Sequence, residues 1–353
     1  MRASAHCNRL HKILVIGPSW IGDTILAQPF LRRLREQHPD GQLDVLAPAW
    51  TLPLLQRMSE VSGGIASPFA HGELRLKARV ALAREQRERR YDHAFVLPNS
   101  FKSALIPWLA RIEVRTGYVG ELRYPLLNDA RRLDARALPM MAERYAALAQ
   151  PAGEPLLRPL PPLRLSVDAA ARADLLQQLG LDLSAAPVVC LCPGAEYGPA
   201  KRWPTQYFAE LARQLRDAGY QIWVIGSNKD HALGAAIALE SGGAAVDLTG
   251  RTNLEQAVDL LSCARHVVSN DSGLMHVAAA LGASVLALYG SSSPAFTPPL
   301  SERAQVLKLD LPCSPCYQRE CPLGHFNCMR QLTPRRVGEA LAQMQASSHE
   351  VAR

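Results

Sequence analysis

The chain has 353 residues, of which 48% are hydrophobic, 20% charged and 6% aromatic. This composition excludes a largely disordered, collagenous or coiled-coil chain, and the length predicts two domains with a core each. No apolar run approaches the roughly 20 residues that cross a bilayer. The run Ile13 to Ile16 ends at Gly17-Pro18, short of the roughly 7–15 residues in the core of a signal peptide. We therefore expect a cytoplasmic protein with a flexible tail over residues 1–11.

The positive charge is concentrated in the N-terminal half. Residues 1–150 hold 22 Lys and Arg against 14 Asp and Glu, a balance of +8, whereas the balance of residues 151–353 is −1. Part of the excess lies in 74–90, which is predicted to be a very basic helix. A basic half indicates an acidic partner, such as a nucleic acid, an anionic membrane surface or an anionic substrate. A solvated, Arg-rich surface is the plainer alternative.

The first half alternates predicted strands and helices. Lys12–Ile16 is a β-branched run typical of a buried strand, and a glycine-bearing loop and an apolar helical pattern from Ile25 to Leu34 follow it. Pro29 interrupts this pattern, so we expect a kink there. Further strands are predicted at 43–46 and 93–97.

The second half repeats the alternation after a proline-rich seam at residues 150–187, which is typical of a linker. Strands are predicted at 188–192, 221–225, 245–248, 266–269 and 284–289, with helices at 205–218, 254–264, 273–281 and 334–344. Such alternation favours parallel sheets covered on both faces. We expect an α/β fold with two doubly wound domains across a cleft.

The expected domain boundaries follow from this pattern. An N-terminal domain covers 12–175 and a C-terminal domain covers 185–332. For the last helix, 333–348, we expect packing back toward the N-terminal domain.

Ligands of open α/β sheets bind at the carboxyl ends of the strands, so the loops after strands are the candidates for chemistry. The first such loop, Gly17 to Asp23, has the pattern G-x-x-x-x-G-D. It lacks the Lys-Ser/Thr of a P-loop and the G-x-G-x-x-G of a dinucleotide fingerprint. Asp23 at a helix start is either an N-cap or a carboxylate available as a general base.

The second loop, residues 193–204, contains Gly194 and Gly198, which let the backbone approach a ligand closely. Lys201 and Arg202 precede a helix N-terminus, where a positive charge opposes the helix dipole. A bound phosphate would compensate that opposition. The alternative is a pair of cations that faces solvent.

The third loop, Ser269 to His276, leads into a helix of small residues. The first N–H groups of that helix suit an anion, while Asp271 is either a ligand contact or a cap. His276 either faces the same anion or is a core histidine. A fourth loop, Gly226 to Asp230, gives only a weak signal for a ribose or a base edge.

Four of the eight cysteines are clustered near the C-terminus: Cys313, Cys316, Cys321 and Cys328. The spacing is compact enough for a tetrahedral zinc site in a reducing compartment. An iron–sulfur site or free thiols are the alternatives. Such a metal would be structural and would hold the segment that precedes the last helix.

Five motifs in order resemble one family. They are IGPSWIGD (16–23), APAW (47–50), VLPNSFKSA (96–104), PGAEYGPAKRWP (193–204) and NDSGLMHVAAAL (270–281). Together they resemble the heptosyltransferases of lipopolysaccharide core assembly, two-domain glycosyltransferases of the GT-B fold, and the likeness extends over residues 12 to about 345. It is greatest to the members that add the second heptose.

The resemblance implies roles for particular residues. Asp23 matches the general base and Lys201 matches the lysine that binds the donor diphosphate. Donor contacts are implied for Ser19, Gly22, Gly194, Ala195, Ser227, Asp271, Ser272, Gly273 and His276. Gly194 and Ala195 replace hydroxyl side chains of some members, so only their backbone N–H groups are available. Acceptor contacts are expected at Lys102, Arg115, Arg123 and Arg144.

The resemblance also implies an inverting transfer of heptose from ADP-heptose to the first heptose on Kdo2-lipid A. The implied partners are these two substrates and the anionic inner-membrane surface, on whose cytoplasmic face the protein would be peripheral, and no nucleic acid. No D-x-D acid pair occurs, so we expect no catalytic metal or other cofactor. The alternatives are heptosyltransferase I or III, with another acceptor, and a non-catalytic module that binds a nucleotide sugar.

Overall fold

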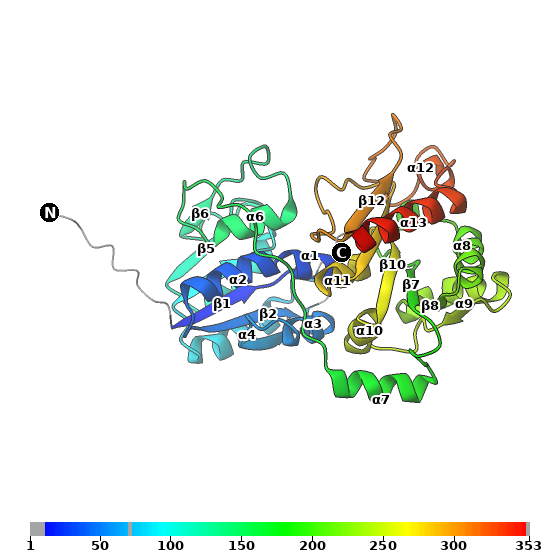
Figure 1. Cartoon of the computed structure of the whole chain (residues 1–353). Helices are drawn as coiled ribbons and strands as arrows, with labels where there is room; N and C mark the ends of the chain where they lie inside the picture. The colour runs from blue at the N-terminus through cyan, green and yellow to red at the C-terminus, as the bar shows by residue number, and fades with distance from the viewer. Residues whose placement is uncertain (1–10, 70–72, 351–353) are drawn as a thin grey trace. The chain divides into compact units, whose positions relative to one another are not determined.

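The computed structural model describes residues 11–69 and 73–350. Most of the expected tail therefore lies outside the described residues. The chain divides into two compact units, residues 1–161 and 162–353, and each described unit is built on one six-stranded sheet (Figure 1). Every strand pairing is parallel, so the predicted α/β class with two doubly wound sheets is confirmed.

The first sheet has the strand order β3-β2-β1-β4-β5-β6. Its strands are β1 (Lys12–Ile16), β2 (Gln42–Pro48), β3 (Gly63–Ser67), β4 (His93–Val96), β5 (Val114–Tyr118) and β6 (Asp129–Arg131). The order reverses between β1 and β4. The loops that follow these two strands therefore diverge and leave a crevice at the carboxyl edge of the sheet.

Helices cover both faces of this sheet. They are α1 (Ile21–Leu26), α2 (Gln28–Gln37), α3 (Leu52–Gln56), α4 (Leu76–Glu88), α5 (Phe101–Leu109) and α6 (Met141–Leu148). Leu14 of β1 packs in one cluster with residues of α4 and α5. Successive residues of a strand point to opposite faces, and on the other face Phe30 of α2 lies edge-on to Phe95 of β4, with ring centroids 5.3 Å apart.

At the expected kink near Pro29 the helix divides into two, joined by the single residue Ala27, whose backbone stays in the helical region. Helix α1 ends at Leu26 and α2 begins at Gln28, with Pro29 in its first turn. Proline is tolerated there because the first N–H groups of a helix have no intrahelical acceptor. The short α1 thus becomes a separate element that carries Asp23.

The second sheet has the order β12-β11-β10-β7-β8-β9. Its strands are β7 (Val188–Cys192), β8 (Gln221–Val224), β9 (Ala245–Asp247), β10 (Ala264–Asn270), β11 (Ser284–Tyr289) and β12 (Ala304–Lys308). The order reverses between β7 and β10, so the two loops that the sequence singled out, 193–204 and 271–276, are neighbours at the carboxyl edge.

The helices of this unit are α7 (Ala169–Leu179), α8 (Thr205–Asp217), α9 (His231–Glu240), α10 (Leu254–Leu261), α11 (Gly273–Ala280), α12 (Asn327–Arg330) and α13 (Pro334–Glu350). Trp203 and Phe208 anchor a core between the sheet, α8, α9 and α13. Helix α13 thus packs on α8, β11 and β12, and its expected return to the N-terminal domain stays a prediction. Among the described residues, no helix has the length and hydropathy to cross a membrane.

Candidate active site

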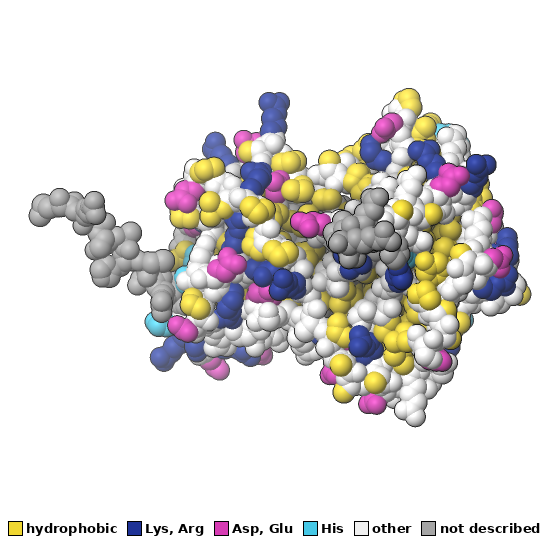
Figure 2. All heavy atoms as spheres, in the orientation of Figure 1, with side chains coloured by type: hydrophobic (Ala, Val, Ile, Leu, Met, Phe, Trp, Pro, Cys, Tyr) yellow, Lys and Arg dark blue, Asp and Glu magenta, His cyan; other side chains and the backbone are white. Residues whose placement is uncertain are grey.

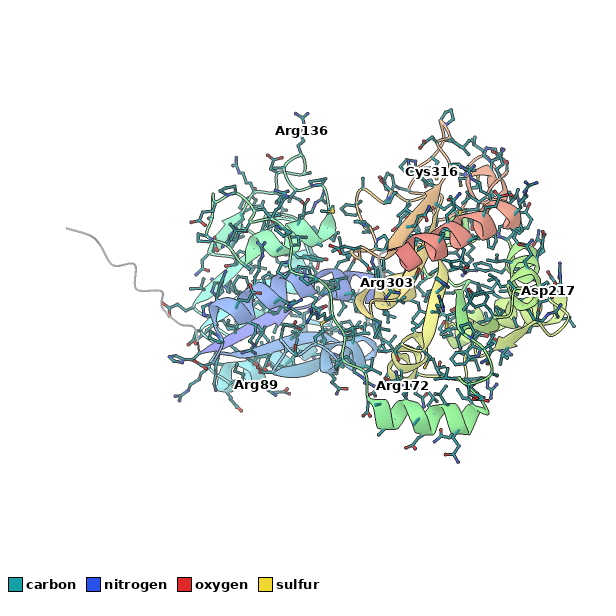
Figure 3. All side chains as sticks on the ribbon, in the orientation of Figure 1. Arg89, Arg136, Arg172, Asp217, Arg303 and Cys316 are labelled. Atoms are coloured by element: carbon teal, nitrogen blue, oxygen red, sulfur yellow. The ribbon has the colours of Figure 1, made fainter. Side chains whose placement is uncertain are left out.

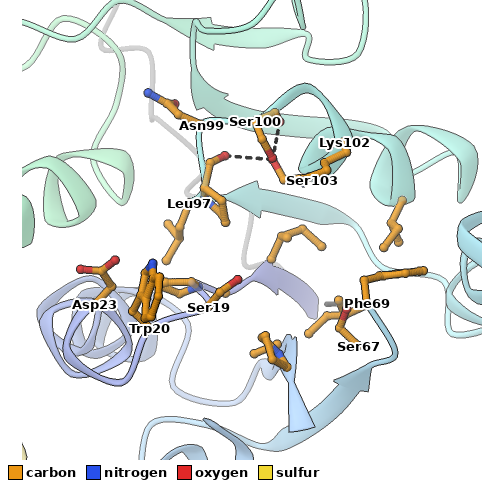
Figure 4. Close-up of a pocket in the computed structure, with 18 of the residues that line it drawn as sticks. Ser19, Trp20, Asp23, Ser67, Phe69, Leu97, Asn99, Ser100, Lys102 and Ser103 are labelled. Carbon is orange, nitrogen blue, oxygen red and sulfur yellow. Dashed lines mark hydrogen bonds between the residues drawn. The ribbon is translucent and has the colours of Figure 1, made fainter. Parts of the chain in front are cut away.

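A cavity of about 670 Å³ opens at the carboxyl edge of the first sheet, where the strand order reverses. Its walls come from the loops after β1, β2 and β4 and from α5 and α6 (Figure 4). The polar side chains in it include Ser19, Asp23, Asn99, Lys102 and Arg144. The cavity therefore joins two carboxylates, those of Asp23 and Glu121, with cations, an amide and several hydroxyls.

Asp23 is the third residue of α1, and Trp20 is the N-cap residue of that helix. No side chain caps α1, so the structure does not support the interpretation of Asp23 as an N-cap. The carboxylate lies at the cavity beside the Trp20 ring (Figure 4). Burial raises the pKa of Tyr145 well above its usual value, and the negative charge of Asp23 adds to the shift. The Asp23 carboxylate is thus close enough to Tyr145, which lines the same cavity, to influence the pKa of its hydroxyl electrostatically.

Ser19 lines this cavity too, although the resemblance implied a donor contact for it. Its carbonyl accepts a hydrogen bond of 3.0 Å from the Trp50 indole. Gly22 is in α1 and is not among the residues that line the cavity.

The four expected acceptor cations separate into two groups. Lys102 and Arg144 line the cavity. Arg123 is fully buried and donates to the carbonyls of Tyr118 and Pro98 and to the side chain of Asn99. Its burial lowers its pKa to about 10, with an opposing effect of Glu121. An acceptor contact at Arg123 is therefore wrong, because its guanidinium is used inside the core.

Arg115 lies near the start of β5, away from the carboxyl edge of the sheet. Its guanidinium donates to the carbonyls of Leu126, 2.7 Å away, and of Ile112, 2.5 Å away. The structure thus uses Arg115 to support a loop outside the cavity, and the expected acceptor contact there stays a prediction.

In the second unit, Lys201 and Asp271 form an ion pair. Lys201 Nζ lies 2.5 Å from Asp271 Oδ2, and the two side chains are only 17% and 5% exposed. Ser292 Oγ donates to the same carboxylate oxygen. Asp271 is therefore a partner of Lys201 rather than a helix cap, and the N-cap residue of α11 is Ser272.

Asn270, at the end of β10, connects its own loop to loop 193–203 through two further hydrogen bonds. Its side-chain oxygen accepts from the Trp203 backbone N–H at 3.0 Å, and its amide donates to the Pro193 carbonyl at 2.7 Å. A buried amide that closes both ends of loop 193–203 fixes the path of that loop over the sheet. Gly194 and Ala195 lie within it, and Ala195 is buried.

The start of α11 carries the remaining donor residues. Ser272 Oγ lies 3.3 Å from Ser269 Oγ, and Gly273 begins the helix. His276, one turn on, is buried, and its Nδ1 has no hydrogen-bond partner among the described residues. Burial lowers its pKa to about 4; Asp271 opposes the shift and Lys201 adds to it. At neutral pH the imidazole is therefore uncharged.

Ser227 is already engaged in the loop after β8. Its N–H and hydroxyl donate to Asp230 Oδ2 at 2.9 and 2.8 Å. The Asp230 carboxylate also fills the space where a Cβ on Gly194 would lie, with a closest approach of 2.6 Å. A side chain at 194 would therefore have to displace this carboxylate, and glycine leaves room for it.

Lys201 and Arg202 do not act as a pair. Arg202 lines a separate cavity of about 290 Å³ with Trp203, Thr205, Phe326 and other residues. Its Nε is buried and has no partner among the described residues. Only Lys201 faces Asp271.

None of the four clustered cysteines is in a disulfide, and all four are partly buried. Cys316 lies beside β12, in the segment that precedes α12 (Figure 3). Among the described residues, no group of three or more His, Cys, Asp or Glu is arranged to hold a metal ion. Backbone N–H groups, first that of Phe326 at 3.4 Å, lower the pKa of the Cys321 thiol.

The pattern of glycosyltransferase family 9 (heptosyltransferase) matches residues 79–327. The chain belongs to this family. The chain is 48% identical over 343 residues to lipopolysaccharide heptosyltransferase 2 of Escherichia coli (strain K12). This match covers 94% of this chain and 97% of the relative. It is 43% identical to lipooligosaccharide heptosyltransferase 2 of Haemophilus ducreyi, and this match covers 95% of this chain and 99% of the relative. The expectation of a glycosyltransferase is thus confirmed.

The same likeness holds in three dimensions. The structure of E. coli ADP-heptose lps heptosyltransferase II matches the family 9 enzyme with a TM-score of 0.86 at 45% identity, over 96% of this chain and 99% of that one. That protein carries the fold that the motifs implied, so the expected GT-B class and the family are both confirmed.

Sequence reasoning missed several residues of the site. Asn270, Ser292 and Tyr197 contact loop 193–203 or the Lys201–Asp271 pair, and none of them was assigned a role. Asn270 stood in a recognised motif, which was a signal. Ser292 gave none, because its position depends on where β11 ends.

Proposed function

We propose that this enzyme transfers a heptosyl group from ADP-heptose to the first heptose of the lipopolysaccharide inner core on Kdo2-lipid A. The observation that carries the proposal is the 48% identity to a heptosyltransferase 2 over 94% of the chain. The chemistry of the two carboxyl-edge sites supports it. One offers a carboxylate in a cavity and the other offers a cation beside a helix start.

The donor half of the proposal rests on the second unit. Lys201 supplies a positive charge to the diphosphate, and the N–H groups at the start of α11 supply hydrogen bonds. Gly194 and Ala195 add backbone N–H groups only. His276 adds one neutral hydrogen bond. Because the Lys201 ammonium is largely desolvated, its attraction for a phosphate exceeds that of a solvated lysine.

The acceptor half rests on the cavity of the first unit. Its volume of about 670 Å³ suits a sugar with part of its neighbours. Lys102 and Arg144 offer positive charge to the phosphates and carboxylates of the acceptor. Asp23 would accept the proton of the attacking hydroxyl.

The reaction is a single displacement. The acceptor hydroxyl oxygen forms a bond to the anomeric carbon, the bond from that carbon to the ADP phosphate oxygen breaks, and the hydroxyl proton passes to Asp23. The electron pair of the broken bond leaves on ADP. A positioned base contributes about 10²–10⁴-fold, and Lys201 with the α11 amides stabilises the charge on the leaving group. The attack from the opposite face gives inversion.

These groups supply both the base and the charge stabilisation, so we expect the transfer to need no cofactor. The cysteines Cys313, Cys316, Cys321 and Cys328 are a separate matter. Zinc bound there would be structural, and it stays a proposal. Metal analysis of the purified protein tests it, and less than about half an equivalent would count against it.

We also propose a peripheral position on the cytoplasmic face of the inner membrane. Exposed Lys and Arg of α4 and its flanks attract anionic lipid by about 1 kcal/mol each near the surface. In Figure 2 the basic side chains of the first unit alternate with acidic and hydrophobic ones on the face in view. Figure 3 shows the side chains of Arg89 and Arg136 projecting outward from the first unit.

One assay tests the acceptor. ADP-heptose is offered with Kdo2-lipid A that carries no heptose, one heptose or two, and the product is identified by mass. The proposal predicts product with the one-heptose acceptor. Product only with the heptose-free acceptor would make the enzyme a heptosyltransferase I, and product only with the two-heptose acceptor would indicate a heptosyltransferase III. ADP-heptose binding without product from any acceptor would indicate a binding module.

A further inference from the structure

Tyr197 lies beside the functional cation of the second unit. Lys201 Nζ is 5.2 Å from the centroid of the Tyr197 ring, within the distance of a cation–π interaction. The ring is 36% exposed, and the lysine side chain is 17% exposed. We propose that Tyr197 is a positioning residue that holds the Lys201 ammonium ready for the donor diphosphate. This inference rests on the proposed role of Lys201 in donor binding.

The ring is itself anchored. Tyr197 Oη donates a 2.7 Å hydrogen bond to the Tyr317 carbonyl, and the Tyr317 N–H donates at 2.7 Å to the carbonyl of Ser291, just after β11. The next residue, Ser292, donates to Asp271. Both neighbours of the ammonium, the ring and the carboxylate, are therefore connected to the same end of β11.

The backbone next to Lys201 is held by the same segment. The Ala200 N–H donates to the Arg319 carbonyl at 3.0 Å. Gly198 has φ +157°, and a Cβ there would collide with that carbonyl oxygen. The Arg319 guanidinium also lies 5.3 Å from the centroid of the Tyr197 ring. Loop 197–201 is thus fastened to residues 317–319 by its backbone and by its tyrosine.

A ring suits this position for an electrostatic reason. Asp271 holds the ammonium but also carries the charge that repels an incoming diphosphate. The face of an aromatic ring attracts a cation without a net negative charge. Tyr197 can therefore orient Lys201 without adding to that repulsion. Without the ring, the long lysine side chain of the free enzyme would also adopt conformers that face water. Binding of the diphosphate would then have to order the side chain, and this loss of conformational entropy would weaken binding.

The test is a double-mutant cycle with Tyr197→Leu, Lys201→Gln and the double variant. The readouts are the Kd of ADP by calorimetry, and kcat and KM for ADP-heptose. We expect Y197L to weaken ADP binding and raise the KM for ADP-heptose by about 3–10-fold, which corresponds to a cation–π contribution of about 0.7–1.4 kcal/mol. In the K201Q background, Y197L should raise the Kd of ADP and the KM for ADP-heptose by less than about twofold, because the cation that the ring would hold is absent.

Two further variants make the cycle specific. Tyr197→Phe keeps the ring and loses the hydroxyl anchor, so it should recover most of the affinity that Y197L loses. Tyr124→Leu, which removes an exposed tyrosine of the first unit, is the matched control and should leave the Kd of ADP unchanged. Equal melting temperatures of the variants would show that each one folds.

The outcomes separate the two proposals. An equal loss from Y197L with Lys201 and without it would mean that Tyr197 only supports the loop, and the inference would be overturned. ADP affinity unchanged in K201Q would instead remove the proposed role of Lys201, and the positioning role would fall with it. No effect of Y197L on the Kd or the KM, with K201Q impaired, would reject Tyr197 alone.

Discussion

Lys201 and Asp271 form a largely buried ion pair, although they are 70 residues apart in the chain. They meet because β7 and β10 are neighbours in the sheet and each residue follows its strand. A lone cation beside a helix N-terminus would be unfavourable, and the carboxylate compensates it while no anion is bound. Under the proposed function, the donor diphosphate would replace Asp271 as the partner of the Lys201 ammonium.

The first prediction concerns this cation. Lys201→Gln should raise the Kd of ADP by about tenfold or more, since a charge-assisted hydrogen bond in a desolvated site contributes about 1.5–3 kcal/mol. Calorimetric titration with ADP measures the change. Lys308→Gln is the matched control, because that lysine pairs with exposed Asp310 on the surface. Equal affinities in wild type and K201Q would remove Lys201 from the donor site.

The second prediction separates two arginines of the first unit. Arg144 lines the cavity, so Arg144→Gln should raise the KM for the lipid acceptor several-fold and leave the melting temperature nearly unchanged. Arg123→Met should do the reverse. It leaves buried carbonyls unpaired at about 1–3 kcal/mol each, and about 2–4 °C of melting temperature is lost per kcal/mol. Kinetics and calorimetric melting of both variants check this. A stable R123M with a raised acceptor KM would reverse the assignment.

The third prediction is a pH dependence of stability. Burial lowers the pKa of His266 to about 4, and neither ring nitrogen has a partner among the described residues. The unfolded chain binds a proton near pH 6.5 and the folded chain only near pH 4, so the free energy of unfolding falls as the pH drops through this window. His93 and His276 shift in the same direction.

Urea denaturation at pH 7 and pH 5 measures this effect. The midpoint should be lower at pH 5, and the difference should shrink in His266→Phe, whose ring can keep the edge-on contact with Tyr220. His11→Gln is the control, since its side chain is exposed. An unchanged difference in H266F would show that this histidine does not contribute.

The fold was predictable where the pattern was strong. The buried runs at β1, β7 and β11 and the helices α8 and α11 lie within one or two residues of their predicted limits. The strands β3, β6 and β12 were missed. They are edge strands or short ones, and their residues are mostly half-buried, so they lack a continuous apolar run.

The seam at 150–187 was predicted as a linker, and it contains helix α7. Only Leu175 of that helix is buried, so its sequence shows little amphipathic signal. Local capping gave the better clue, because Asp168 accepts from the N–H groups of Ala170 and Ala171.

The site was predictable in its loops but not in its pairings. Asp23, Lys201 and Asp271 could be proposed as site residues because they follow strands. The Lys201–Asp271 contact needed the order of the strands, which a local pattern does not contain. The expected acceptor contact at Arg123 was wrong because its burial could not be predicted from the sequence. A charged residue is seldom buried, and only the carbonyls around it show why this one is.

The most direct test of the proposed reaction is the turnover of Asp23→Asn with ADP-heptose and the one-heptose acceptor, measured beside the Kd of ADP. The substitution keeps the shape of the side chain and removes its basicity. Turnover should fall by about 10²-fold or more while the Kd of ADP stays that of the wild type. Glu88→Gln, an exposed carboxylate at the end of α4, should change neither value. Wild-type turnover in D23N would contradict the assignment of Asp23 as the general base.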